Sequence, residues 1–275
     1  MGKRKKSWKQ PVGRLSEYGS STRAQAICKG RRFGLFLWAR HSRLWRWTAT
    51  TSINPQTLSS EVLSIGQGQR YDLVFTVPSS GIVEVVNAFS GQVTSIGQGN
   101  LSIPKNLNDL PIFDLTSSGV PVLSALAPDA RFDANYTVTL GSKPGFRFGQ
   151  IELIHTMNGG AFPDSPTLVV EKGQMVHVRL ENKSAEYHPI HLHGHVLTVL
   201  RVNDRPVTGS PVRQDTVLVY PHQTADVAFV ADNPGLWMLH CHVLIHANFG
   251  MDMMVVYPNI STPYTIGTKS GNFPD

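Results

Sequence analysis

From Ile53 onward the chain alternates between apolar and polar positions in short runs. The runs YDLVFTV (71–77) and IVEVVNAF (82–89), separated by a turn at 78–81, predict a β-hairpin of strands rich in β-branched residues. A looser stretch lies between about 104 and 135. Seven more such runs follow it: TVTLG, TLVVEKG, MVHVRLEN, VLTVLRV, DTVLVYP, TADVAFVA and LWMLHCHV. Since no run has a helical period, the pattern predicts an all-β fold, an antiparallel sandwich or Greek-key barrel.

Length and composition agree with a globular protein. The chain has 275 residues, of which 41% are hydrophobic and 16% charged, so it can bury a large core and lacks the composition of a disordered or fibrous protein. It has no run of about 18 apolar residues, which argues against a membrane-spanning helix. Two cysteines allow at most one disulfide, so the fold does not depend on a disulfide framework.

The net charge of +6 comes from one end of the chain. Residues 1–49 hold 13 of the 25 Lys and Arg and one acid, Glu17, whereas the remainder carries 12 basic and 18 acidic residues. Such a segment can bind nucleic acid or an anionic membrane, or it can be solvated and disordered. We expect 1–49 to be disordered or non-native, with no nucleic-acid or membrane partner. The apolar stretch after Arg31 and Arg32 is too short for an export signal, so the cellular location stays unknown.

The histidines give the clearest sign of chemistry. Seven of the eleven lie in two stretches, HPIHLHGH and HCHVLIH, and the second surrounds Cys241. Imidazole and thiolate groups are ligands of transition metals. Zinc sites usually have Cys pairs or a His-Glu helix motif, and neither is present here. One Cys with two His and a weak thioether is the ligand set of a blue-copper centre, so the pattern favours copper.

Strand geometry divides the ligands in LWMLHCHV into two sets. Side chains alternate between the two faces of a strand, so Cys241 lies on one face and both His240 and His242 on the other. We therefore expect the sulfur to reach one metal ion while the two imidazoles reach others behind it. The backbone between them would be a short covalent path for electrons.

The two histidine stretches resemble the C-terminal copper signatures of multicopper oxidases, and the chain looks most like a laccase. HPIHLHGH and HCHVLIHANFGM carry the resemblance. PVRQDTVLVYP and ADNPGLWMLHCH are similar to the third cupredoxin domain of that family, and NPQTLSSEVLSIGQGQRYDLVF is similar to the end of the second. The resemblance covers about 52–258. It implies a partial cupredoxin domain at 50–118 and a complete C-terminal one at 119–275, each with the Greek-key fold.

The resemblance also implies a complete type 1 copper site. His188, Cys241 and His246 match its three strong ligands, and Met251, ten positions after the cysteine, matches its axial ligand. In laccases a phenol or aromatic amine docks near this copper and gives it electrons. His246 stands at the position that matches this docking site, and four such electrons reduce dioxygen to water at a trinuclear centre.

The same resemblance implies that the trinuclear centre is only half present. His191 matches a type 2 ligand, and His193, His240 and His242 match ligands of the type 3 pair. The family uses eight imidazoles from four motifs, and we find only two of the motifs in this sequence. We therefore expect an N-terminally truncated oxidase whose turnover on its own is absent or very weak.

Other interpretations stay open. The type 1 set alone would make a blue-copper electron-transfer or copper-binding protein without oxidase turnover, and the basic segment leaves a nucleic-acid binder as a weaker alternative. Among the other histidines, we expect His155 and His222 in loops, His177 on a strand facing solvent, and His195 in a structural role beside the ligands. Asp215 resembles a recurrent family position, but the sequence assigns it no role. It does not indicate an oligomeric state either.

Overall fold

The computed structural model describes residues 61–72 and 110–261 with their side chains, and elsewhere only the backbone of strands. Strands before residue 100 form two sheets, with the orders β1-β2-β8-β4-β5, to which β6 adds at β4, and β10-β9-β3-β7. Their bounds are β1 Leu15–Tyr18, β2 Ser21–Ile27, β3 Gly34–Trp38, β4 Ser42–Trp47, β5 Thr50–Thr51, β6 Thr57–Leu58, β7 Val62–Ser64, β8 Arg70–Phe75, β9 Gly81–Asn87 and β10 Val93–Gln98.

The strands of the first part bear on the basic segment and on the expected hairpin. Within residues 1–49, which the sequence predicts to be disordered or non-native, the structure has the backbone of strands β1–β4, while 1–14 and the residues between these strands lie outside the described residues. Whether this segment is native stays a prediction. The prediction that β8 and β9 form a hairpin is wrong, because β8 pairs with β2 and β4 and β9 pairs with β3 and β10. A strand pattern defines which residues are extended, but strands adjacent in sequence can enter opposite sheets of a sandwich. The domain boundary near 118 stays a prediction.

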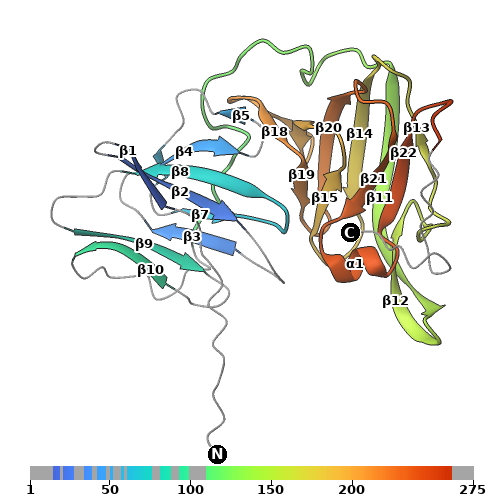
Figure 1. Ribbon diagram of the computed structural model, residues 1–275, viewed down its shortest axis with the longest axis horizontal. Helices are drawn as coiled ribbons and strands as arrows, with labels where there is room; N and C mark the ends of the chain where they lie inside the picture. Colours follow the sequence, from blue (N-terminus) through green and yellow to red (C-terminus); the bar gives the residue numbers. More distant parts are fainter. Residues whose placement is uncertain are drawn as a thin grey trace, which may run out of the picture.

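The second part of the chain is a β-sandwich (Figure 1). One sheet has the order β12-β11-β14-β20-β16-β17, with β18 paired to β16, and the other has the order β13-β22-β21-β15-β19. Most pairs are antiparallel, and β11–β14 and β13–β22 are parallel. The bounds are β11 Ala134–Arg147, β12 Gln150–Met157, β13 Leu168–Val169, β14 Met175–Asn182, β15 His188–Leu192, β16 Leu197–Val202, β17 Arg205–Pro206, β18 Val212–Gln214, β19 Thr216–Val219, β20 Thr224–Val230, β21 Leu236–Cys241 and β22 Asp252–Val256.

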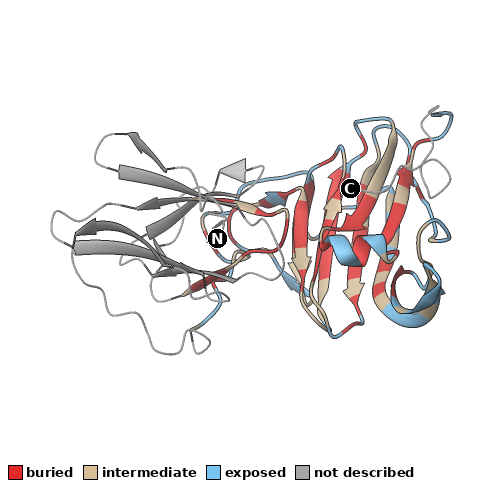
Figure 2. Cartoon of the chain, turned by 60° about the horizontal axis from the view of Figure 1, so that its bottom comes forward, coloured by how far each residue is buried: buried red, intermediate tan, exposed pale blue. Residues whose placement is uncertain are grey.

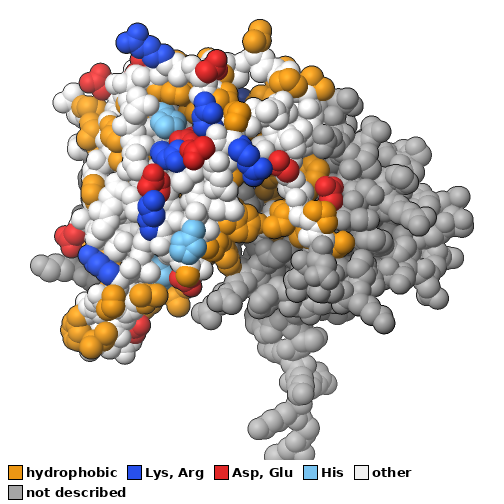
Figure 3. Space-filling view, turned by 180° about the vertical axis from the view of Figure 1, so that it is seen from behind, with side chains coloured by type: hydrophobic (Ala, Val, Ile, Leu, Met, Phe, Trp, Pro, Cys, Tyr) orange, Lys and Arg blue, Asp and Glu red, His pale blue; other side chains and the backbone are white. Residues whose placement is uncertain are grey.

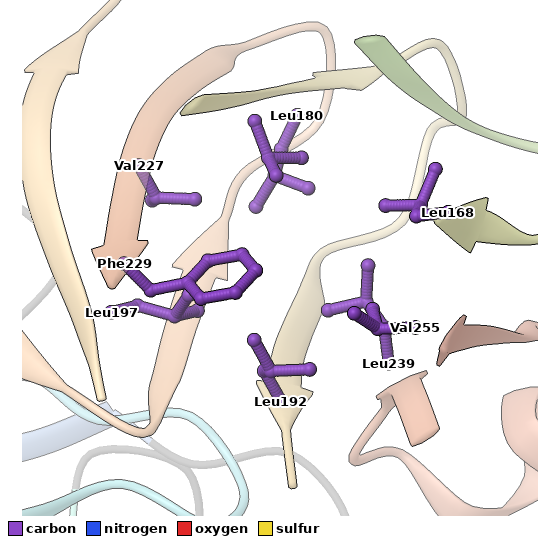
Figure 4. Close-up of a pocket in the computed structure, with 9 residues that line it drawn as sticks. Leu168, Leu180, Leu192, Leu197, Val227, Phe229, Leu239 and Val255 are labelled. Atoms are coloured by element: carbon purple, nitrogen blue, oxygen red, sulfur yellow. The ribbon is translucent and has the colours of Figure 1, made fainter. Parts of the chain in front are cut away.

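The all-β prediction is confirmed, and each of the seven runs after residue 135 contains or overlaps a strand. In β14 burial alternates strictly, and Val176, Val178 and Leu180 point inward. Side chains from both sheets, among them Leu192 and Phe229, meet around a cavity of about 10 Å³ (Figure 4). A cavity this small and apolar stays dry. The sandwich interior around this cavity is therefore a packed core, with no room for a ligand.

The exposed features lie outside this core. Figure 2 shows buried positions concentrated along the strands of the sandwich, while the end of the β11–β12 hairpin is exposed. Among the described residues, the only α-helix is α1 (Leu244–Asn248), which follows β21, so none is long enough to cross a membrane. The residues 110–133 link the two parts of the chain, and Phe113 donates its backbone N–H to Val62 in β7.

Candidate metal centre

Two antiparallel strands bring the two histidine stretches together. In the pairing of β15 with β21, Ile190 lies opposite Cys241 and His191 lies opposite His240. Partners in a sheet project to the same face, and residues two apart along a strand share a face. This register therefore places His188 on the side of Cys241, and His191 on the side of His240.

Cys241, His188 and His246 form a compact buried group. The Sγ atom of Cys241 lies 3.6 Å from the Nδ1 atom of each histidine, and the two Nδ1 atoms are 3.1 Å apart. Zinc binds imidazole nitrogen and thiolate sulfur at about 2.0 and 2.3 Å. Donor atoms that share one transition-metal ion of similar size would be roughly 3.5 Å apart. The three donors therefore fit a single trigonal metal site.

A second group of imidazoles lies on the opposite face of β21. Ring nitrogens of His191, His193 and His240 lie within 4.8 Å of one another, and the Nε2 atoms of His193 and His240 are 3.0 Å apart. His242 is next to them, with its ring centre 5.6 Å from that of His191 and 5.7 Å from that of His240. One strand thus separates a group with sulfur from a group without it, as the alternation in LWMLHCHV predicts.

Comparison with known proteins decides the family. The family model described as "Multicopper oxidase" matches residues 132–261, which include both groups. Residues 132–261 are a multicopper oxidase domain. Multicopper oxidase MmcO of Mycobacterium tuberculosis is 31% identical over 205 residues, which are 72% of this chain and 38% of that protein. The L-ascorbate oxidase of Cucurbita maxima is 36% identical over 97 residues, 30% of this chain and 17% of that enzyme. The chain thus spans well under two thirds of these relatives.

Solved structures support the same fold. The crystal structure of Fet3p, a multicopper oxidase that functions in iron import, matches with a TM-score of 0.65 and 16% identity, covering 85% of this chain and 55% of that one. The laccase of Botrytis aclada matches with a TM-score of 0.57 and 20% identity, covering 84% of this chain and 50% of that one. At these identities the likeness shows the fold, so the prediction of a cupredoxin sandwich is confirmed.

Multicopper oxidases are copper-dependent oxidoreductases, and the donor set of the first group suits copper. Two imidazoles and one thiolate in a trigonal arrangement are typical of a blue-copper site. Burial lowers the pKa of His188 to about 4 and raises the pKa of the Cys241 thiol, so without a metal ion these side chains are neutral. A bound ion reverses this preference for the sulfur, because a coordinating thiol loses its proton.

A hydrogen bond behind His188 prepares it to bind a metal ion. Its Nε2 atom lies 2.7 Å from the hydroxyl of Ser184, whose single proton is directed to Asn182 Oδ1 or to the carbonyl of Glu186. The Ser184 oxygen then accepts from Nε2–H, which leaves the lone pair of Nδ1 facing Cys241. The sequence gives no signal for Ser184, because its role depends on a contact rather than on a motif.

Met251 lies close to the first group. It is fully buried; its backbone N–H donates to the carbonyl of His246 at 3.0 Å, and its own carbonyl accepts from the N–H of Cys241 at 3.0 Å. These bonds hold the backbone after α1 beside the cysteine. Its assignment as the axial ligand stays a prediction, as do the type 2 and type 3 assignments of the second group.

His155 differs from its prediction. The prediction that it lies in a loop is wrong, since it is buried in β12, and its ring stacks on that of His246 with centres 4.1 Å apart. Burial lowers its pKa. Glu186 lies beside both rings, with Oε2 3.5 Å from Nε2 of His246 and 4.0 Å from Nδ1 of His155. Spacing in the sequence gave no signal for these contacts, because β12 belongs to the other sheet and reaches His246 only in the folded chain.

The remaining histidines have structural surroundings. His195 Nε2 lies 2.7 Å from the hydroxyl of Tyr257, and its Nδ1 lies 3.1 Å from the carbonyl of His193, so it packs beside the second group. His177 in β14 bonds Asp226 at 2.9 Å, and His222 is an exposed turn residue. None of these three belongs to a group of metal donors among the described residues.

Proposed function

We propose that this chain is the electron-accepting part of a laccase-like multicopper oxidase that oxidises phenols or aromatic amines and passes the electrons toward dioxygen. The observation that carries the proposal is the buried triangle of Cys241 Sγ and the Nδ1 atoms of His188 and His246. Copper held by these atoms would supply reversible one-electron chemistry. The second group would contribute to the centre where dioxygen is reduced.

Cys241 connects the two groups. Its sulfur belongs to the first group, while its sequence neighbours His240 and His242 lie at the second. Only a few backbone bonds separate the sulfur from these imidazoles. Copper at the first group would accept the electron, and the backbone of β21 leads directly from Cys241 to the histidines of the second group. This path supports electron transfer between two centres rather than storage at one.

The surface above His246 supports an aromatic substrate. His246 is buried on the inner side of α1, while Leu244 and Ile245 of the same helix are exposed. Phe148, at the end of the β11–β12 hairpin, is exposed and contacts Phe249 edge to face. Figure 3 shows hydrophobic side chains gathered at this hairpin end. Apolar side chains and aromatic rings favour packing of a flat aromatic molecule close to His246.

A metal ion is the second candidate substrate. His155, Glu186 and His246 each offer a donor atom, and these atoms lie within 4.8 Å of one another. Nε2 of His246 faces Glu186, whereas Nδ1 of the same ring faces Cys241. The iron transport multicopper oxidase fio1 of Schizosaccharomyces pombe is 30% identical over 139 residues, 40% of this chain and 22% of that protein. A reducing metal ion at this group could give its electron through the His246 ring.

Copper titration of the full chain tests the proposal. We expect an intense visible thiolate-to-copper band that saturates at about one copper, and we expect Cys241→Ser to abolish it. Cys28→Ser is the matched control, because it makes the same chemical change at the other cysteine of the chain and should keep the band. A well-folded chain without this band would contradict the proposal. A chain that binds one copper with this band, and no further copper at the second histidine group, would favour a blue-copper electron-transfer protein instead.

Anaerobic reduction of the coloured copper separates the two substrates, since it requires no reduction of oxygen. If phenols are the substrate, replacing Ile245 by Ser slows bleaching by a phenol at least about tenfold, while Glu186→Gln leaves it unchanged. If metal ions are the substrate, Glu186→Gln instead slows bleaching by ferrous ion to a similar degree. The ratio of the two rates in each variant therefore identifies the substrate class.

A further inference from the structure

Residues 66–70, from the first part of the chain, lie against the second histidine group. Arg70 forms two hydrogen bonds with Asp215, from Nη1 to Oδ1 at 3.2 Å and from Nη2 to Oδ2 at 2.8 Å. Gln69 donates from Nε2 to the carbonyl of Thr216 at 3.1 Å, in buried surroundings. The turn between β18 and β19 is therefore held by side chains that come from outside the sandwich.

This turn controls the ring of His191. Nδ1 of His191 lies 2.8 Å from the carbonyl oxygen of Asp215. A carbonyl only accepts hydrogen bonds, so Nδ1 carries the proton and the lone pair of Nε2 is free for a metal ion. The carboxylate of Asp215, held by Arg70, fixes the peptide that provides this carbonyl. Arg70 is thus linked to His191 through Asp215 alone.

Gly68 contacts a second histidine directly. Its φ is +81°, and a Cβ placed on it would lie 2.5 Å from Cδ2 of His242. The backbone of Gly68 therefore packs against the imidazole at a distance that no side chain allows. Nη1 of Arg70 also donates to the carbonyl of Gly68 at 2.7 Å. The contact with His242 and the contact with Asp215 are thus tied together by one guanidinium group.

We infer that residues 66–70 are a positioning element for the copper ligands of the second group. Arg70 acts through Asp215 on the tautomer and orientation of His191, and Gly68 limits the rotation of the His242 ring. This inference rests on the proposed function, because it takes both imidazoles to be copper ligands. It gives Asp215 a role, and it makes the assembly of this group depend on a segment outside the multicopper oxidase domain at 132–261.

Copper affinity of the full chain provides the first test, with Arg70→Met and Asp215→Asn. We expect the copper that has no thiolate band to bind about 10–100-fold more weakly, as is usual when the partner of a ligand is lost, while the thiolate band stays unchanged. Arg179→Met is the matched control, because Arg179 bonds Asp226 at 3.0 Å in the other sheet. Affinity within twofold of this control in both variants would overturn the inference.

Gly68→Ala tests the second contact. Gly173 also has a positive φ, of +93°, but an added Cβ there would meet no described atom within 4 Å. Gly173→Ala therefore carries the same backbone strain without the contact. We expect only Gly68→Ala to weaken binding of the copper without a thiolate band. Equal effects of the two substitutions would contradict a role for Gly68.

A measurement without copper keeps the two proposals distinct. Long-range 1H–15N NMR of the copper-free chain reports which nitrogen of His191 carries the proton. We expect Nδ1–H in the wild type and a mixture of tautomers in Arg70→Met. An unchanged tautomer in that variant overturns the inference even if the variant binds copper more weakly. A wild-type chain without a thiolate band refutes the proposed function, whatever the tautomer of His191.

Discussion

At the residue scale, the centre depends on which nitrogen of each imidazole is free. His188 is bonded through Nε2 to Ser184, and His191 is bonded through Nδ1 to the carbonyl of Asp215, so the two rings present opposite nitrogens to their groups. Partners of this kind set the tautomer and the basicity of a ligand. The chain therefore prepares each histidine separately, with a polar group that belongs to neither histidine motif.

Ser184→Ala should weaken the first group without removing a ligand. Nε2 of His188 then loses its acceptor in buried surroundings, so its neutral tautomers become closer in energy. We expect the affinity for the copper with the thiolate band to fall about 10–100-fold. Ser117→Ala, on the exposed linking segment, is the control. Titration of both variants, followed by the intensity of the visible band, checks this, and equal affinities would show that Ser184 does not orient the ring.

Asp252 should make the stability of the copper-free chain depend on pH. Neither of its carboxylate oxygens has a hydrogen-bond partner among the described residues, and burial raises its pKa to about 7. Its pKa is higher in the folded state than in the unfolded state, so the free energy of unfolding falls as the pH rises from about 4 to about 7. At pH 8 we expect Asp252→Asn to raise it by about 1–3 kcal/mol.

Urea unfolding at pH 5 and pH 8 measures this effect. Asp226→Asn is the matched control, because Asp226 is also buried but accepts hydrogen bonds from Arg179 and lies 2.9 Å from His177. Its replacement should lower stability, since charge-assisted bonds are lost. If Asp252→Asn instead destabilised the chain as much as Asp226→Asn does, Asp252 would have a partner that the structure does not show.

At the element scale, the segment after β21 folds the chain back onto Cys241. α1 carries His246, and Gly250 then turns the backbone so that Met251 and β22 return along β21. The φ of Gly250 is +111°, and a Cβ there would lie 2.5 Å from that of Ala161 and 3.0 Å from the carbonyl of His155. Only glycine satisfies both the backbone angle and the close approach.

Gly250→Ala should therefore disturb both stability and colour. We expect a loss of about 2–4 kcal/mol, and a shifted or weakened thiolate-to-copper band because His246 and Met251 move. Gly149→Ala separates backbone strain from steric contact, since Gly149 has a φ of +84° with open space around it among the described residues. This substitution should lower the free energy of unfolding by only about 1 kcal/mol. Thermal unfolding and the visible spectrum of both variants check this. An unchanged spectrum in a destabilised Gly250→Ala would mean that the turn does not position the ligands.

The sequence correctly predicts features that depend on the backbone of a single strand. Alternation in LWMLHCHV correctly separates Cys241 from His240, because the two faces of a strand are a property of its own backbone. Pairing is not local, so the hairpin expected from β8 and β9 was wrong. The loop expected at His155 was also wrong, since β12 is long and brings this residue from another sheet. The contacts made by Ser184 and Arg70 depend on tertiary structure in the same way.

At the scale of the whole molecule, copper would connect segments that are distant in the sequence. The first group takes one donor from β15, one from β21 and one from α1, and the second group is held by residues 66–70 from the first part of the chain. An ion that bridges distant segments stabilises the folded state, because the unfolded chain does not hold the donors together. Binding and folding of the sandwich are therefore linked.

Copper should raise the melting temperature through this linkage. At a free concentration 1,000 times the dissociation constant, the expected gain is about 4 kcal/mol, reduced by any binding to unfolded Cys and His. For a domain of this size that corresponds to a shift of about 8–16 °C. Cys241→Ser should lose most of the shift, because Cys241 supplies the sulfur of the first donor group among the described residues. Cys28→Ser, the same chemical change at the other cysteine, should keep it. Calorimetry with and without copper measures both. A full shift in Cys241→Ser would place the stabilising copper at the second group, and the strongest site would then be the one without sulfur.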